Sequence, residues 1–277
     1  MSRLSRLLSP DCASAAGYRL LHAIGPRLDK TRQIRRNVTI AFPEKTVAEI
    51  DSLVREIWGN LGAVLVEFPH LGTICGREAD RRLEFTRKGN AQVFKQQGKP
   101  AVFVSAHLAN WEVAAAAIVL QKVPLAVVYT PIQNPWMDKM LRSVRVSLGC
   151  ELIDRVGAVR QLIRRLKAGT SVGLIVDQRV DGGEAVPFFG HDMITSVTPA
   201  QLAVRFDCEL IPVQIQRLEG ARFRVIFHKP VDADDKSAGD REKVLQMTKK
   251  INTLFESWIR ERPHEWMCSK RRWPKDL

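Results

Sequence analysis

The sequence has no apolar run long enough to span a membrane, which takes about 20 predominantly apolar residues. The nearest candidate, "CASAAGYRLLHAIG" (residues 12–25), is short and carries Arg19 and His22. It also lacks the clean apolar core before a cleavage site that is typical of a secretion signal. Two interpretations stay open for this stretch: a basic amphipathic helix on a membrane surface, or an ordinary packing helix.

Cysteine is scarce and scattered. The five cysteines form no Cys-x-x-Cys pair (Cys12, Cys75, Cys150, Cys208 and Cys268). An odd number at irregular spacing argues against a disulfide framework and against a structural zinc site. The pattern fits a reducing cytosol, and each thiol is expected to be a small core side chain.

Acidic residues are outnumbered: 43 Lys and Arg stand against 30 Asp and Glu, for a net charge of +13. Such a surface favours nucleic acid, an anionic membrane or an acidic carrier protein, or it serves only for solubility. A nucleic-acid module would interleave aromatic and basic residues on a sheet, or present a recognition helix. The basic residues here are spread along expected helices, which disfavours nucleic acid as a partner.

Short apolar segments alternate with helical patterns from residue 100 onward. Strands are expected at 101–106, 124–129, 151–153 and 171–178, and helices at 111–121, 134–149 and 159–169. This alternation predicts an α/β fold: a mixed, mainly parallel central sheet flanked by helices. A further helix (198–206, with Thr198 as N-cap), a strand pair (209–218 and 221–229) and a last helix (240–261) should follow.

The N-terminal part has a helical pattern of apolar residues instead of alternating strands and helices. Residues 46–68 carry apolar side chains at helical spacing, and Thr46 and Glu49 form a capping-box pattern. There is no repeat, low-complexity tract or obvious linker. We expect a helical, membrane-associating portion (1–70) and an α/β domain (71–277) that form one continuous unit.

The stretch "SAHLANWE" (105–112) places a titratable pair between two apolar segments. His107 should lie where a strand ends, which is where ligands bind in open α/β sheets. Asn110 is a candidate N-cap, and Glu112 would then lie in the first helical turn, close enough to orient His107 as a general base. No Gly-x-Ser-x-Gly elbow is present, so the nucleophile is expected on the substrate. The alternative is a His–Glu pair that only satisfies the local structure.

The same stretch resembles the His-x(4)-Asp/Glu motif of glycerolipid-type acyltransferases. Its Asn-Trp-Glu ending is similar to the bacterial lipid A biosynthesis (lauroyl/myristoyl) acyltransferases. Four other segments resemble that family in order along the chain: "NVTIAFPEKT" (37–46), "NPWMDKMLRSVRVSLG" (134–149), "DQRVDGGEAVPFFG" (177–190) and "RPHEWMCSKRRWP" (262–274).

The resemblance implies roles for individual residues. His107 would deprotonate an acceptor hydroxyl, and Glu112 would support it. Arg142 or Arg145 would contact the acceptor phosphate or hold the charge relay, with the choice between them open. Asn110, Asp177 and Gln178 would contact the substrate at the same site, unless Asp177 only caps a loop. Phe188 and Phe189 would line an acyl-chain channel, unless they are plain core aromatics.

The resemblance also implies O-acyl transfer from an acyl carrier protein thioester to a hydroxyl of an anionic lipid A precursor. No metal and no other cofactor is expected, and the protein would lie on the cytoplasmic face of the bacterial inner membrane, attached peripherally. Another glycolipid, such as a phosphatidylinositol mannoside, or a glycerolipid is an alternative acceptor. A basic, non-catalytic membrane- or nucleic-acid-binding protein is the alternative outside enzymes.

Overall fold

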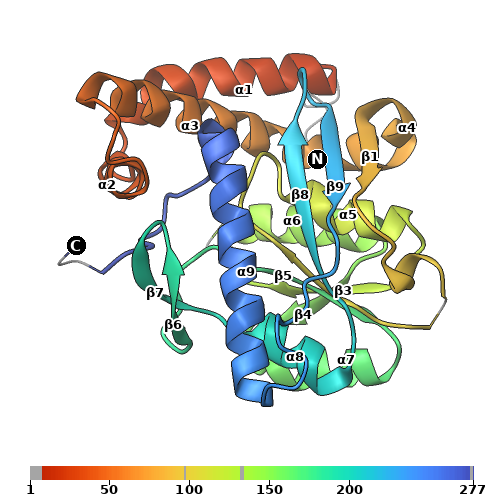
Figure 1. The fold of residues 1–277 in the computed structure, drawn as a ribbon. Helices are drawn as coiled ribbons and strands as arrows, with labels where there is room; N and C mark the ends of the chain where they lie inside the picture. Colours follow the sequence, from red (N-terminus) through yellow and green to blue (C-terminus); the bar gives the residue numbers. More distant parts are fainter. Residues whose placement is uncertain (1–7, 97, 132–133, 275–276) are drawn as a thin grey trace.

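A seven-stranded sheet forms the centre of the protein in a computed structural model, which describes residues 8–96, 98–131, 134–274 and 277 (Figure 1). The strand order is β1 (Leu83–Arg87), β9 (Phe223–Phe227), β8 (Leu210–Arg217), β2 (Val102–Ser105), β5 (Ser171–Ile175), β3 (Leu125–Tyr129) and β4 (Glu151–Asp154). All neighbouring pairs are parallel except β8 and β9. The predicted mixed, mainly parallel α/β fold is confirmed.

Helices cover both faces of this sheet (Figure 1). One face packs against α5 (Glu112–Leu120) and α6 (Pro135–Ser147), and the other against α7 (Ala158–Lys167), α8 (Thr198–Phe206) and α9 (Asp240–Glu261). Because side chains alternate along a strand, Phe103 belongs to the core on the α5 side and Val104 to the core on the α7 side. The central strands β2, β3 and β5 are therefore apolar on both faces, as the sequence suggested.

The N-terminal helices are α1 (Pro10–Ile24), α2 (Thr31–Ala41) and α3 (Val47–Glu67). The predicted capping box at Thr46 and Glu49 is present. Helices α1 and α3 lie in close contact, since a Cβ atom added at Gly17 would come within 2.4 Å of the Gly62 carbonyl oxygen. Residues 1–7 of the expected helical portion lie outside the described residues.

The outer face of α1 exposes Leu20 (58%) and Ile24 (43%) beside Arg19, and Leu28 beyond the helix is also exposed. Measured over the part of the chain that the structure describes, none of the helices combines the length and the apolar character that a membrane crossing requires.

Several elements carried no recognised signal in the sequence. They are β1, the antiparallel hairpin of β6 (Glu184–Phe188) and β7 (His191–Thr195), the short helix α4 (Ala79–Arg82), and the one-turn helices η2 (Gly25–Arg27), η3 (Phe68–His70), η4 (Thr73–Arg77), η5 (Gln92–Phe94) and η6 (Pro263–Glu265). The capping prediction for α8 was wrong. Thr198 is the first residue of α8 and Val197 is its N-cap, because the backbone is already helical at Val197.

Candidate active site

The chain between β2 and α5 is held in one conformation by contacts from distant segments. Ala109 adopts a positive φ of 48°, which costs a residue with a side chain about 1 kcal/mol or more. Its N–H donates to the Glu265 carbonyl (3.0 Å), and its carbonyl accepts from the Asn60 side chain (3.2 Å). The N–H of Met267 donates to the carbonyl of His107 (2.9 Å). The C-terminal segment and α3 therefore fix the loop that carries His107.

His107 is paired with a buried carboxylate. Its Nδ1 lies 2.6 Å from Oδ1 of Asp177, whose side chain is only 1% exposed. The second oxygen, Oδ2, accepts a hydrogen bond from the Trp266 indole N–H (3.0 Å). With the proton on Nδ1, the pair fixes the tautomer in which Nε2 is the basic nitrogen.

The carboxylate of Asp177 is kept ionised. Burial by itself acts to raise its pKa, but the attraction of His107 and the hydrogen bonds from His107 and Trp266 outweigh it, and the pKa lies below its ordinary value. An ionised Asp177 stabilises the imidazolium that forms when His107 takes up a proton. His107 is thereby suited to act as a general base.

Two neighbours pack against the imidazole ring. The amide nitrogen of Gln178 is 3.4 Å from Nδ1 and 3.3 Å from Nε2. Because these distances are nearly equal, the amide is not aligned with one ring nitrogen in particular. The Trp111 ring meets the imidazole edge to face, with centroids 5.2 Å apart. The two side chains limit the orientations that His107 can adopt.

Glu112 does not have the partner expected for it. Arg145 donates two hydrogen bonds to its carboxylate, from Nε (2.7 Å) and Nη2 (2.6 Å), and the Trp111 indole N–H donates a third (3.1 Å). Among the described residues, the carboxylate that contacts His107 is that of Asp177. Asn110 accepts from the Glu112 N–H (3.2 Å), but the N-cap of α5 is Trp111. Asn110 is also fully buried and does not line the cavity, so its expected contact with the substrate is corrected.

The expected Glu112–His107 contact is therefore corrected, and the physical reason is charge. The guanidinium of Arg145 offers a fork of donors that matches a carboxylate, and the attraction of Glu112 raises the pKa of Arg145 despite its burial. The two arginines differ in placement. Both guanidiniums lie over the Tyr129 ring, but Arg145 lines the cavity at His107, whereas Arg142 is exposed.

A second buried carboxylate supports the loop from behind, and sequence reasoning missed it. Glu67 is fully buried and accepts from Ser14 of α1 (2.6 Å), from Asn110 (2.8 Å) and from the guanidinium of Arg217. Arg217 also donates to Asn60 (3.1 Å). The network joins α1, α3, β8 and the loop, and its sequence signal was a carboxylate at the end of the uncharged second half of α3 (57–67).

His107 faces a cavity of about 600 Å³, within the size range of small-molecule sites. Its wall is largely apolar and includes Phe68, Phe103, Ala114, Ile118, Leu125, Leu141 and Leu162. Gln178, Glu112 and Arg145 also line it. Four of the predicted site residues thus line one cavity, His107, Glu112, Arg145 and Gln178, and Asp177 lies directly behind His107.

Phe188 and Phe189 lie elsewhere, so their expected place in the wall of an acyl channel is corrected. They are 0% and 6% exposed and pack with Trp266 and Trp273 in the core. The hairpin β6–β7 turns both rings inward, and Glu256 accepts from the Phe189 N–H (2.8 Å). They stabilise the segment that carries Trp266.

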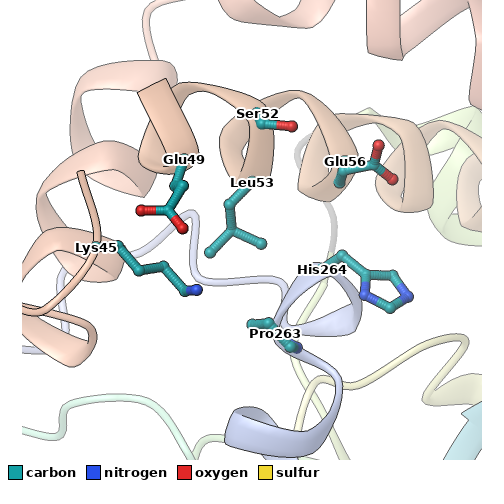
Figure 2. A pocket seen from close by; sticks show the side chains of 7 residues that line it. All are labelled: Lys45, Glu49, Ser52, Leu53, Glu56, Pro263 and His264. Carbon is teal, nitrogen blue, oxygen red and sulfur yellow. The ribbon is translucent and has the colours of Figure 1, made fainter. Parts of the chain in front are cut away.

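A second hollow, between α3 and η6, lacks comparable chemistry (Figure 2). Figure 2 shows Lys45, Glu49, Glu56 and His264 around it. Glu49 is engaged in the Thr46 capping box and Glu56 accepts from Tyr18. Within the described ranges no group of three or more His, Cys, Asp or Glu side chains is arranged to hold a metal ion.

The fold and the site define an α/β protein that holds a carboxylate-paired histidine against an apolar cavity. The chain belongs to the bacterial lipid A biosynthesis acyltransferase family, whose sequence profile matches residues 2–275. It is therefore an acyltransferase, and the family suggested by the sequence motifs is confirmed.

Characterised relatives are distant but extend along most of the chain. A phosphatidylinositol mannoside acyltransferase of Mycolicibacterium smegmatis is 23% identical over 96% of this chain and 92% of its own. A lipid A biosynthesis acyltransferase of Haemophilus influenzae is 21% identical over 91% and 79%, respectively. The crystal structure of a 1-acyl-sn-glycerophosphate acyltransferase of Thermotoga maritima is similar with a TM-score of 0.40 and 13% identity, covering 90% of this chain and 99% of that one.

Proposed function

We propose that the protein transfers a fatty acyl group from the thioester of an acyl carrier protein to a hydroxyl of a lipid A precursor, with His107 as general base. The observation that carries this proposal is the placement of His107 between the buried carboxylate of Asp177 and an apolar cavity. A base at the rim of a lipid-sized space suits a reaction in which both substrates carry hydrocarbon chains.

In the proposed reaction His107 first accepts a proton and later returns it. Nε2 of His107 removes the proton of the acceptor hydroxyl as its oxygen forms a bond to the thioester carbonyl carbon. The carbon–sulfur bond then breaks, and the imidazolium returns the proton to the departing thiolate. Asp177 holds the tautomer and stabilises the imidazolium throughout.

Glu112 has a different part in this proposal from the one its motif suggested. Its charge is balanced by Arg145 beside the cavity, and the pair fixes α6 against the start of α5. Trp111 links the pair to the imidazole, since its indole N–H bonds Glu112 while its ring packs on His107. Glu112 therefore acts as a positioning residue, and Asp177 is the direct partner of the base.

A membrane-bound acceptor and an acidic donor protein both suit the charge of +13. The exposed face of α1 combines Leu20 and Ile24 with Arg19, which suits a helix lying on an anionic membrane surface. We accordingly place the protein at the cytoplasmic face of the inner membrane, attached peripherally. No further cofactor enters the proposed reaction.

A phosphatidylinositol mannoside is the second candidate acceptor. A relative with that name matches this chain as well as the lipid A enzymes do. Both acceptors are anionic glycolipids that offer a hydroxyl, so the base and its carboxylate serve either one.

The purified protein should be incubated with an acyl carrier protein thioester and either a tetra-acylated lipid A precursor or a phosphatidylinositol mannoside. We expect transfer to the lipid A precursor, and loss of at least about 100-fold in His107→Ala. His264→Ala, in the hollow of Figure 2, is the matched control and should retain activity. Equal rates for both variants would refute the role of His107, and transfer only to the mannoside would select the second acceptor.

A further inference from the structure

The cavity at His107 reaches both faces of the sheet. On the α5 side its wall includes Phe103, Ala115, Ile118 and Leu125, which we call the α5 lobe. On the other side it includes Val128, Ala158, Leu162 and Leu174, which we call the α7 lobe. Neighbouring residues of one strand, such as Val127 and Val128, line different lobes. The two apolar spaces meet where β2 and β5 end.

The rims of the two lobes differ in charge. Beside the α5 lobe, Arg145 is neutralised by two hydrogen bonds to Glu112. Arg155, in the turn between β4 and α7, and Arg179, in the loop that follows β5, also line the cavity and are exposed. Of the ion pairs formed by the residues that the structure describes, none includes Arg155 or Arg179. The α7 lobe thus has two cations available for an anion.

We propose that the α7 lobe binds a hydrocarbon chain of the acceptor lipid, whose phosphate is held by Arg155 and Arg179. The α5 lobe then takes the donor chain, because the neutral Glu112–Arg145 rim suits the uncharged thioester. This assignment rests on the proposed acyl transfer. It places the two substrates on opposite faces of the sheet with their reactive ends together at His107.

The N-termini of two helices strengthen the anion preference of the α7 lobe. Ala158 is the first residue of α7 and Thr198 the first of α8, and both line the cavity. The positive ends of both helix dipoles therefore lie at the cavity that Arg155 and Arg179 also line. The phosphate could belong to the acceptor lipid or to the phosphopantetheine arm of the donor, and the kinetics below separate the two.

Matched Ala→Leu substitutions test the assignment, because Ala115 and Ala158 are both half-buried and each lines one lobe. Ala158→Leu should raise the KM for the acceptor about tenfold and leave the preference for donor chain length unchanged. Ala115→Leu should raise the KM for long-chain donors by a similar factor and spare the acceptor. Ala168→Leu, on the exposed end of α7, is the control. A shorter donor preference in Ala158→Leu would overturn the proposal.

The double variant Arg155→Gln/Arg179→Gln should raise the KM for the acceptor about tenfold or more, since each charge-assisted contact to phosphate is lost. A raised KM for the donor with an unchanged acceptor KM would assign the cations to the phosphopantetheine arm and overturn the acceptor assignment. Unchanged KM values for both substrates would refute the proposal that Arg155 and Arg179 bind a phosphate.

A binding measurement keeps this test separate from the proposed function. Decyl phosphate should raise the melting temperature of the wild-type protein more than decanol does. The difference should vanish in Arg155→Gln/Arg179→Gln, and Ala158→Leu should weaken decyl phosphate binding about tenfold while Ala115→Leu does not. If no acyl transfer occurs but this binding pattern is observed, the proposed function is wrong, while the assignment of the α7 lobe as a binding site for a phosphorylated hydrocarbon chain is supported. Equal weakening in both alanine variants would contradict the two-lobe assignment.

Discussion

Asp177 and Glu67 are both buried carboxylates, 3% and 0% exposed, but they have different kinds of partner. Asp177 bonds an imidazole that faces a cavity, whereas Glu67 bonds the guanidinium of Arg217 inside a closed network. An imidazole can gain or lose a proton near neutral pH, and a guanidinium cannot. The first arrangement can therefore take part in proton transfer, while the second can only hold the chain in place.

Asp177→Asn should produce the largest effect. The Asn amide would donate to Nδ1 of His107 and force the proton onto Nε2, which could then no longer accept one from a hydroxyl. We expect the acyl-transfer rate to fall by about 10³- to 10⁴-fold, with a melting temperature close to that of the wild type. Steady-state kinetics and thermal unfolding together check this. A loss of activity that merely follows a loss of folded protein would contradict the catalytic assignment.

Glu67→Gln should act mainly on stability. It leaves Arg217 without a counter-ion in a buried network, a change that costs about 3 kcal/mol or more of unfolding free energy. Activity per folded molecule should fall much less than in Asp177→Asn. Urea unfolding measures the first quantity and single-turnover rates the second.

Glu56→Gln on the same helix is the matched control, because Glu56 is half-buried and bonds Tyr18. It should change the unfolding free energy by about 1 kcal/mol or less. Equal stability losses in the Glu67 and Glu56 variants would show that the closed network is not specially stabilising.

Glu112 is a third buried carboxylate, and its partner is Arg145 of α6. Arg142 lies one turn away on the same helix and provides the comparison. Arg145→Gln leaves Glu112 buried with fewer donors, and we expect a loss of about 2 kcal/mol in stability and about tenfold in rate. Arg142→Gln removes only an exposed cation over Tyr129. It should change the unfolding free energy by about 0.5 kcal/mol or less and the acyl-transfer rate by less than about twofold. A larger effect of Arg142→Gln than of Arg145→Gln would show that the Glu112–Arg145 pair does not support the site.

His228 shows what an imidazole does without a carboxylate. It bonds the Gln214 side chain (3.0 Å), and burial, together with the nearby charge of Lys88, lowers its pKa to about 4. Since the folded-state pKa is below the ordinary 6.5, stability is fully present above pH 6.5 and is lost as the pH falls towards 4. His228→Gln should flatten this dependence in urea unfolding at pH 7.5 and 5. An unchanged slope would assign the pH dependence to other groups.

Most of the sheet and its helices could be predicted, because buried strands and amphipathic helices leave periodic patterns. The hairpin β6–β7 and strand β1 were missed. The hairpin contains Pro187 and charged residues, and β1 is mostly exposed, so neither has the apolar pattern of a core strand. The predicted packing of Phe188 and Phe189 failed for a similar reason, since sequence does not tell a cavity wall from a core.

The site was predictable only in part. The end of β2 and the family motif located His107, and the end of β5 placed Asp177 and Gln178 nearby. The carboxylate that bonds His107 depends on a contact between residues 70 positions apart, and Trp266 reaches it from 89 positions away. Local spacing favoured Glu112 instead. A guanidinium from another helix competes for Glu112, and spacing along the chain holds no information about that competition.

The central claim is that Asp177 acts through His107, and a double-mutant cycle tests it most directly. Acyl-transfer rates should be compared for wild type, His107→Ala, Asp177→Asn and the double variant. Residues that act as a unit are strongly non-additive, so the double variant should be about as slow as His107→Ala alone. If Asp177→Asn slows the His107→Ala protein by the same factor as it slows the wild type, the two residues act independently and the account is contradicted.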